Sequence, residues 1–285
     1  MNFSILYRGP LSSCNYSCDY CPFAKTKNTR AELEDDKKKL RRFVNWTKEN
    51  AQHHFGILFT PWGEALIRKY YQEAITELSH SENIRKVAIQ TNLSCPTGWM
   101  KHCNPDKLAL WTTFHPTQIS RADFVKKCRQ LFESGVRFSV GTVGFTDALP
   151  EIEKLREELP PEIYVWVNAN KKTADYYSEE NINRLLAVDP LFSWNLHAHQ
   201  SLGESCRAGE SVFSVDGDGN MTRCHFIKTR IGNIYDPSWE KALRRQACTN
   251  ATCGCHIGYV HLDKLNLQPV YGDGLLERIP VDMGK

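Results

Sequence analysis

Short apolar segments alternate with longer helical patterns over residues 1–188, and this rhythm constrains the fold more than any other feature. The predicted strands are rich in β-branched and aromatic residues, whereas the helical segments repeat apolar residues about every 3.6 positions. We expect strands at 3–7, 55–59, 86–90, 108–113, 137–143 and 164–168, and helices at 34–52, 64–79, 120–134, 147–158 and 178–187. Such alternation predicts an α/β fold with a parallel sheet and right-handed crossovers.

The number of strand–helix units indicates how the sheet closes. A complete TIM barrel needs about eight units, and this chain offers six. Residues 1–190 are therefore expected to form a partial (β/α)6 TIM-like barrel. In parallel α/β architectures the chemistry lies at the carboxyl ends of the strands, so the polar residues that follow each strand are candidates for function.

After Asp189-Pro190 the rhythm changes. Residues 211–224 are typical of a hairpin, with Asp216-Gly217-Asp218-Gly219 at its turn. A short helix is expected near 238–247, followed by a stretch rich in cysteine. We expect residues 191–285 to form a small cysteine-rich α+β domain.

Charge and hydropathy exclude several classes of protein. The net charge of the 285 residues is +3, which indicates neither a nucleic-acid nor an anionic-membrane partner. No apolar run approaches the roughly 20 residues that span a bilayer, and the N-terminal MNFSILYRGP does not look like a secretory signal. A cytoplasmic location is expected, and the basic run at 37–42 is interpreted as a solvated helix face.

The eleven cysteines are unevenly placed. Three lie within 14–21, five within 206–255, and three are scattered between them. Clustered cysteines in a reducing compartment favour metal over disulfides. The scattered Cys95, Cys103 and Cys128 are interpreted as small buried apolar residues.

Cys14, Cys18 and Cys21 have the spacing C-x3-C-x2-C and follow the first predicted strand. Thiolates suit zinc or an iron–sulfur cluster. A structural zinc site closes with a fourth ligand, and no further cysteine or histidine follows within the next thirty residues. Three cysteines would leave one iron of a 4Fe–4S cluster open to a cofactor. A zinc site completed by a distant ligand remains the alternative.

This motif resembles that of the radical S-adenosylmethionine superfamily, in which an aromatic residue, here Tyr20, precedes the third cysteine. Residues 60–66, TPWGEAL, resemble the family's Gly-Gly-Glu-Pro motif after the second strand, although Trp62 and Ala65 replace its first glycine and its proline. The resemblance implies that Gly63 and Glu64 help to hold the methionine amino group of the cofactor.

Weaker matches follow at later strand ends. Asn92 ends the third predicted strand, Thr113 and His115 end the fourth, and Val143 lies at the end of the fifth. The resemblance implies that these residues contact the ribose, the carboxylate or the adenine of the cofactor.

The resemblance also implies the chemistry. An open iron would chelate S-adenosylmethionine, and a low-potential electron would cleave it to methionine and a 5′-deoxyadenosyl radical that abstracts hydrogen from the substrate. The cofactors would be the 4Fe–4S cluster and S-adenosylmethionine. A flavodoxin- or ferredoxin-type protein would donate the electron.

The C-terminal cysteines suggest a second site. From the spacing of these cysteines alone, zinc and an iron–sulfur cluster are equally plausible occupants of the site. The order of Cys-x-Ala-Gly, Asp-x-Asp-Gly-x4-Cys and Ile-Gly-Asn-Ile resembles the SPASM or Twitch extension, which implies an auxiliary 4Fe–4S cluster. The resemblance pairs Cys206 with Cys224 as ligands. Cys253 and Cys255 are favoured for the other two positions, with Cys248 as substitute, and His256 is treated as a neighbour of the site.

An auxiliary cluster implies an oxidative outcome, so the leading hypothesis is an oxidoreductase that modifies a peptide or peptide-like substrate. The first alternative is a dehydrogenase of a small natural-product or sugar intermediate, and the second is a non-enzymatic zinc or iron–sulfur protein. The substrate pocket is expected between the sheet and the C-terminal domain. The residues expected to line it are His115, Asn168, Asn170, Tyr176, Tyr177, His197 and His199.

Overall fold

One large sheet organises the molecule. The computed structural model describes residues 1–23 and 26–282, and its sheet has nine strands in the order β11-β10-β9-β1-β2-β3-β4-β5-β6. The strands from β1 to β6 pair in parallel, each with the next in the chain. They are β1 (Asn2–Arg8), β2 (His54–Phe59), β3 (Ile84–Thr91), β4 (Leu108–Thr113), β5 (Arg137–Gly144) and β6 (Val165–Ala169). The six predicted strands and the α/β class are confirmed.

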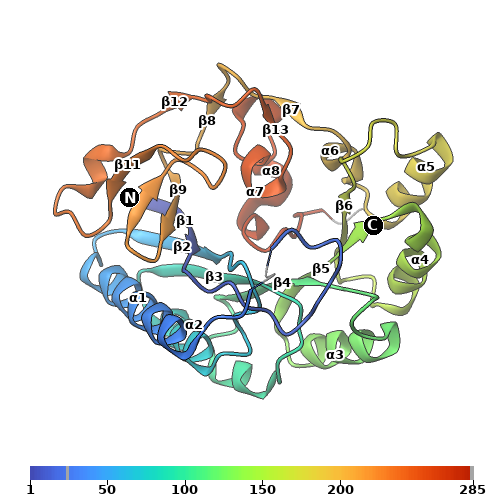
Figure 1. Cartoon of the computed structure of the whole chain (residues 1–285), viewed down its shortest axis with the longest axis horizontal. Coiled ribbons are helices and arrows are strands. Elements are labelled where there is room, and N and C mark those ends of the chain that lie inside the picture. The colour runs from blue at the N-terminus through green and yellow to red at the C-terminus, as the bar shows by residue number, and fades with distance from the viewer. Residues whose placement is uncertain (24–25, 283–285) are drawn as a thin grey trace.

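Four helices connect these strands and a fifth follows β6, in the order the sequence predicts. They are α1 (Arg30–Glu49), α2 (Lys69–His80), α3 (Arg121–Glu133), α4 (Leu149–Glu158) and α5 (Glu179–Val188). Between β3 and β4 the connection contains only the 3-10 helix η1 (Gly98–His102). In Figure 1 these five helices lie along one side of the sheet.

Two helix starts differ from the prediction. α1 begins at Arg30, four residues early, because Thr29 and Glu32 form a capping box: the Thr29 hydroxyl accepts from Glu32 N, and Thr29 N donates to the Glu32 carboxylate at 2.7 Å. α2 begins at Lys69, later than the predicted residue 64, because the segment before it forms a turn in which the Glu64 carboxylate accepts from Leu66 N.

The sheet separates two apolar layers. Side chains alternate along each strand, so Ile5 and Ile57 face the helices and belong to the main core. Their neighbours Leu6 and Leu58 face the opposite side, where they pack with Leu276 from the C-terminal segment. Figure 1 shows this segment, with α7 (His256–Tyr259) and α8 (Gln268–Tyr271), on the side of the sheet away from α1 to α5.

A buried ion cluster fixes the C-terminal segment to the sheet. Glu277 is fully buried, and its carboxylate pairs with Lys86 Nζ at 3.2 Å and with Arg137 Nε at 2.5 Å. Lys86 also pairs with Asp273, and Ser139 Oγ donates to the Glu277 carbonyl at 2.6 Å. Buried charges need such partners, so residues 273–277 are held in one position against β3 and β5.

The predicted hairpin is confirmed and extends the main sheet. β9 (Val212–Asp216) and β10 (Asn220–Thr222) are antiparallel, and Asp216 Oδ1 accepts from the backbone N of Asp218 and Asn220 across the turn. β9 pairs in parallel with β1, and β11 (Arg230–Asn233) completes this edge. The helix expected at 238–247 is wrong in length, because only the 3-10 turn η3 (Trp239–Ala242) forms before β12 (Gln246–Ala247).

Short elements complete the C-terminal part. α6 (Phe192–Leu196) follows α5, and two small sheets each pair a cysteine-bearing strand with a distant one. β8 (Ser205–Cys206) pairs with β12, and β7 (His199–Gln200) pairs with β13 (Thr252–Cys253).

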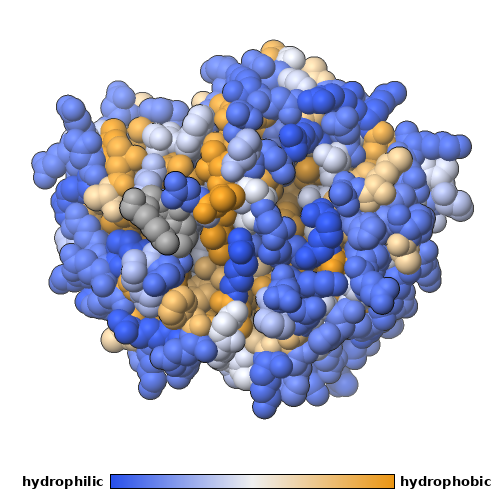
Figure 2. Space-filling model, turned by 180° about the vertical axis from the view of Figure 1, so that it is seen from behind, coloured by the Kyte–Doolittle hydropathy of each residue, from blue (hydrophilic) through white to orange (hydrophobic). Residues whose placement is uncertain are grey.

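The surface fits the sequence prediction in part. Figure 2, the view from behind, shows hydrophobic residues gathered in the middle of this face and hydrophilic ones around them. The basic run at 37–42 lies on a largely solvated helix face, as predicted; Leu40 is buried beneath it and Arg41 pairs with Glu77. Among the described residues, no helix is both long and apolar enough to cross a membrane.

Candidate functional site

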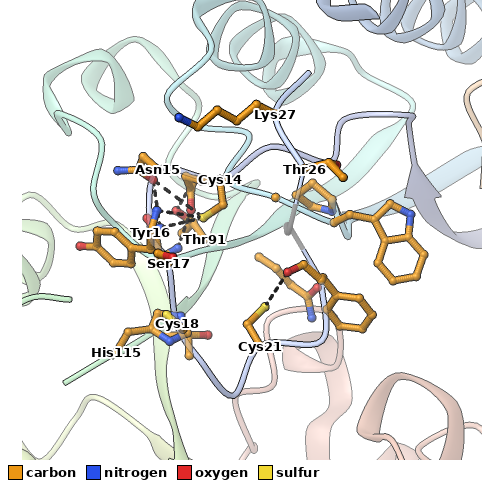
Figure 3. A pocket seen from close by; sticks show the side chains of 18 residues that line it. Cys14, Asn15, Tyr16, Ser17, Cys18, Cys21, Thr26, Lys27, Thr91 and His115 are labelled. Carbon is orange, nitrogen blue, oxygen red and sulfur yellow. Dashed lines mark hydrogen bonds between the residues drawn. The ribbon is translucent and has the colours of Figure 1, made fainter. Parts of the chain in front are cut away.

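The three N-terminal cysteines border one cavity of about 500 Å3 at the carboxyl ends of β1 to β4. Figure 3 shows Cys14, Cys18 and Cys21 arranged around it, with Thr91 and His115 on the same side. The lining residues are Cys14, Asn15, Tyr16, Ser17, Cys18, Cys21, Phe23, Thr26, Lys27, Pro61, Trp62, Gly63, Glu64, Gln90, Thr91, Asn92, Thr113 and His115. The sequence thus places distant motifs around a single space.

Cys14 Sγ accepts two hydrogen bonds that would stabilise a thiolate, whereas Cys21 Sγ is a donor. Cys14 Sγ accepts from Tyr16 N at 3.4 Å and from Asn92 Nδ2 at 3.7 Å, while Cys21 Sγ donates to the Phe23 carbonyl at 3.4 Å. Burial raises the pKa of the Cys14 and Cys18 thiols, which favours their protonated forms. In the described part of the chain no group of three or more His, Cys, Asp or Glu side chains is arranged to hold one metal ion.

Tyr20 connects the cysteine loop to the end of β4. Its hydroxyl lies 2.8 Å from His115 Nδ1, and the two rings stack with centroids 6.0 Å apart. Burial lowers the pKa of His115 to about 4, so this imidazole is neutral at physiological pH. Its ring can therefore donate or accept one hydrogen bond into the cavity without bringing a charge.

Gly63 brings the loop after β2 against the cysteine loop. A Cβ at this position would lie 1.9 Å from the Ser13 carbonyl oxygen, and the next residue, Glu64, donates its N–H to the same oxygen at 3.1 Å. Only glycine permits this contact between two backbones. The position of the cysteine loop therefore depends on Gly63.

Glu64 is buried at the floor of the cavity. Its Oε1 accepts from Thr91 Oγ1 and from Leu66 N at 2.9 Å, and its Oε2 accepts from Asn92 N at 2.6 Å. Burial raises the pKa of this carboxyl to about 6, although these hydrogen bonds oppose the shift. A carboxylate has about four acceptor positions, so one position on Oε2 is left for a ligand.

The remaining predicted cofactor contacts divide into two groups. Asn92, Thr113 and His115 border the cavity, and Asn92 Nδ2 also donates to Asn15 Oδ1 at 3.2 Å. Val143 is not among the described residues that border it, because the cavity lies at the ends of β1 to β4 and Val143 belongs to β5.

The C-terminal cysteines gather in a second place. Cys206, Cys224 and Cys248 are buried in one small core, with Cys253 packed against it. β8, which carries Cys206, pairs with β12, which ends just before Cys248, and β13, which carries Cys253, pairs with β7. Cys255 is not in this core, and the residue is exposed. Its neighbour His256 is buried among the rings of Trp111, Tyr259 and Tyr271, which are not metal ligands.

Most of the residues expected to line the substrate pocket instead hold loops. Tyr177 OH donates to the Gly144 carbonyl and accepts from Asn170 N, and Tyr176 OH accepts from Thr146 N. His199 Nε2 lies 2.8 Å from the Trp194 carbonyl, and Asn168 Oδ1 accepts from Asn195 Nδ2. His197 is exposed. His115 is the one of this set that borders the cavity, within the described residues.

Three cations near Cys255 have no counterpart in the sequence prediction. Arg8 ends β1, Lys171 follows β6, and Arg278 belongs to the C-terminal segment. The charges of all three lower the pKa of the Cys255 thiol, against the larger effect of burial, which raises it. Of these three residues, only Arg8 could have been found from the sequence, because it lies at the end of a strand. Nothing in spacing or composition joins it to residues 171 and 278.

No protein-family model matches the sequence, and no curated protein does either. Among solved structures, native anSMEcpe with bound AdoMet matches at a TM-score of 0.56 and 18% identity, over 84% of this chain and 80% of its own. The same enzyme with bound AdoMet and the Kp18Cys peptide matches at 0.56 and 17%, over 84% and 80%. BtrN with AdoMet and 2-DOIA matches at 0.38 and 16%, over 86% and 83%. The chain thus shares its α/β fold with anSMEcpe.

Proposed function

We propose that this chain is a radical S-adenosylmethionine enzyme that oxidises its substrate. The observation that carries the proposal is the single cavity bordered by Cys14, Cys18 and Cys21 together with Glu64. A loop with three cysteines and a strand-end carboxylate are separate in the sequence, and a structural zinc site requires no such carboxylate. The fold shared with anSMEcpe supports the same assignment.

In this proposal residues 1–190 form a partial (β/α)6 barrel that binds the first 4Fe–4S cluster through Cys14, Cys18 and Cys21. When bound, the cluster and S-adenosylmethionine supply the reductive cleavage that gives methionine and 5′-deoxyadenosine. Tyr16 N and Asn92 Nδ2 donate toward Cys14 Sγ and so stabilise its thiolate. The free acceptor position of Glu64 holds the methionine amino group, and Asn92, Thr113 and His115 orient the rest of the cofactor.

Residues 191–285 would bind an auxiliary 4Fe–4S cluster. The shared core of Cys206, Cys224, Cys248 and Cys253 supports these four as ligands. The exposure of Cys255 makes this residue the spare cysteine, in place of Cys248 as the sequence had favoured. Four thiolates complete a cluster without an open iron, which suits it to accept an electron from the substrate.

A peptide or peptide-like substrate is favoured by the anSMEcpe structures with bound peptide. A flavodoxin- or ferredoxin-type electron donor and a cytoplasmic location are parts of the same proposal. The aromatic side chains of Tyr16 and Trp62, which border the cavity, would exclude water from the cofactor.

Anaerobic reconstitution tests the proposal. Wild type should hold about eight irons and release 5′-deoxyadenosine only when dithionite and S-adenosylmethionine are both present. The triple variant Cys14→Ala, Cys18→Ala, Cys21→Ala should keep about four irons and lose this activity. Stoichiometric zinc with no cleavage in the wild type would contradict the proposal.

Single variants test the auxiliary ligands. Cys248→Ser should lose about four irons because it opens the second site. Cys255→Ser should keep them all. The matched control is Cys128→Ser, which alters a buried cysteine on α3 outside both groups.

A further inference from the structure

A second cavity lies at the amino ends of the strands, away from the cysteine loop. Its volume is about 300 Å3, and none of its described lining residues borders the cofactor cavity. The first residues of β1, β3 and β9 form one part of its wall, and residues of the C-terminal part between 261 and 276 form another. Because the cofactor cavity lies at the carboxyl ends of β1 to β4, the two cavities are at opposite edges of the sheet.

Small residues on the sheet border this space. On the face covered by the C-terminal segment, Leu6 and Leu58 pack with Leu276 in one apolar cluster. Two residues earlier on β1 and β2 are Ser4 and Gly56, which pair with each other. Since residues two apart on a strand share a face, Ser4 and Gly56 lie under the same segment with almost no side chain between them and it. The cavity therefore lies where the apolar packing of this face ends.

Arg85 places a guanidinium group over this part of the sheet. An added Cβ on Gly56 would lie 3.4 Å from Arg85 Nη2 and 3.7 Å from Ser4 Oγ, so the two polar atoms lie on the same face. Arg85 Nη2 donates to the Phe3 carbonyl at 3.2 Å, and among the described residues this side chain has no other hydrogen bond and no ion pair. Glycine at position 56 thus leaves room for a guanidinium group that still has unbonded N–H groups.

Arg207 is the second arginine at this cavity. Its Nη1 donates to Gln268 Oε1 at 2.8 Å, which positions the guanidinium and leaves the amide NH2 of Gln268 as a donor. Its one ion pair with a described residue is to Asp263, at 3.7 Å between Nε and Oδ1, and Asp263 also pairs with Arg245. Two arginines share this carboxylate, so the charge of Arg207 is compensated only in part.

The other charged groups at the cavity are already paired. Lys86 Nζ lies 2.9 Å from Asp273 Oδ2 and 3.2 Å from Glu277 Oε1. Asp273 is the one carboxylate among the lining residues that the structure describes, and it is bound to Lys86. The cavity therefore presents two incompletely paired guanidinium groups, whereas its carboxylate already has a partner.

His261 adds a neutral polar group to the same cavity. The residue is 3% exposed, and its Nδ1 has no hydrogen-bond partner within the described chain. Burial lowers the pKa of His261 to about 4, and the charge of Arg207 acts in the same direction, so the ring is neutral at physiological pH. A buried polar nitrogen without a partner costs free energy. The described protein groups alone therefore leave the hydrogen bonding around this cavity incomplete.

We propose that this cavity binds a small molecule through a carboxylate or phosphate group that pairs with Arg85 and Arg207. Planar guanidinium groups match both oxyanions with two parallel hydrogen bonds, and the one described carboxylate at the cavity is already paired. Val212, Leu275 and Leu276 provide apolar surface for the carbon part of the ligand. The site is separate from the proposed cofactor cavity, and a bound ligand would join β3 to the C-terminal part of the chain.

Isothermal titration calorimetry of the full, reconstituted chain tests the site. S-adenosylmethionine is present in excess to occupy the cofactor cavity, and chloride holds the ionic strength constant. Inorganic phosphate and succinate are titrated separately: saturable binding of phosphate identifies a phosphate site, and saturable binding of succinate identifies a carboxylate site. Arg85→Gln should weaken this binding about tenfold or more, because it removes a charge-assisted contact. Arg85→Lys keeps the charge and should restore part of the affinity.

Two further variants separate the cavity from a general effect of charge. Arg30→Gln removes an exposed arginine on α1, outside the cavity, and should bind the anion as the wild type does. Ser4→Leu keeps every charge but fills the space, so it should abolish binding; its unfolding temperature without anion shows whether it folds. If it does not fold, the two arginine variants still decide the question. Absence of saturable binding with both anions, equal weakening in Arg30→Gln and Arg85→Gln, or unchanged binding in folded Ser4→Leu would overturn the proposal.

Discussion

Gly63 is the residue at which the cysteine loop and the β2 loop touch. A methyl group there would lie 1.9 Å from the Ser13 carbonyl oxygen, a contact with rigid backbone. Gly63→Ala should therefore destabilise the protein by about 3 kcal/mol, the upper end for overpacking, and displace Cys14. Thermal unfolding and iron content measure the two effects. Gly98→Ala is the matched control, because an added Cβ there meets nothing within 4 Å. Equal behaviour of the two variants would contradict this account.

Glu64 predicts a pH dependence of cofactor binding. Burial raises the pKa of its carboxyl to about 6, so the group is ionised above that pH and neutral below it. An amino group binds the ionised form, so affinity is present at pH 7 and is lost as the pH falls through 6. The Kd for S-adenosylmethionine should rise about tenfold between pH 7 and pH 5. Glu64→Gln should bind S-adenosylmethionine more weakly at pH 7 and show no such loss of affinity between pH 7 and pH 5. It serves as the control because every other titrating group is unchanged. Parallel curves for both proteins would refute the role of Glu64.

Residues with local signals were predictable, whereas those that depend on distant contacts were not. Cys14, Cys18 and Cys21 follow one another within a single loop, and Glu64 lies in a short motif at a strand end, so spacing was enough to place them. Arg278 has no motif, because its burial against the Trp166 ring comes from a tail that returns to the sheet. The choice between Cys248 and Cys255 stays a prediction for the same reason, because it depends on how β12 and β13 pair with distant strands.

Among the elements, the C-terminal segment is fixed to the sheet by Glu277. Lys86 is 3% exposed and would keep only Asp273 as a partner after Glu277→Gln. Breaking a buried ion pair costs about 3–5 kcal/mol, and we expect about 3 kcal/mol because Asp273 remains. Denaturant unfolding of the apoprotein measures this loss. Glu73→Gln removes a partner from an exposed pair on α2 and should cost under about 0.5 kcal/mol. Similar losses in both variants would argue against the segment's anchoring role.

Strands were easier to predict than the ends of helices. Buried parallel strands are continuous apolar runs, so all six were found within two residues of their ends. The start of α1 was missed because its first turn is charged, and only the capping box at Thr29 and Glu32 marks it. The start of α2 was placed too early because the apolar spacing of residues 64–68 continues that of the helix, although Glu64 turns toward β3.

At the scale of the whole molecule, the sheet includes strands from both ends of the sequence. β1 has β2 on one side and β9 on the other. A fragment of residues 1–190 would leave one edge of β1 unpaired, and exposed edges of apolar strands aggregate. We expect this fragment to be insoluble where the full chain is soluble, as sedimentation after expression would show. A soluble, monomeric fragment would mean that the edge at β1 is protected without β9.

The pairing of β9 with β1 could not be predicted from the sequence. The hairpin itself has a local turn signal at Asp216–Gly219, but an edge-to-edge pairing of strands depends on which surfaces meet after the chain folds. The hairpin of residues 211–224 was therefore predicted correctly, but the sheet to which it belongs was not predicted.

The position of β9 also determines when the sheet can be completed during synthesis. Roughly 200 residues separate β1 from β9, which a ribosome makes in about 10–40 s at 5–20 residues per second. Through this interval the cysteine loop has already left the ribosome, while the sheet beside it is still incomplete. Every described residue that borders the cavity lies between Cys14 and His115, so the whole lining of the proposed cluster site has been synthesised before β9, while β1 still lacks its second partner.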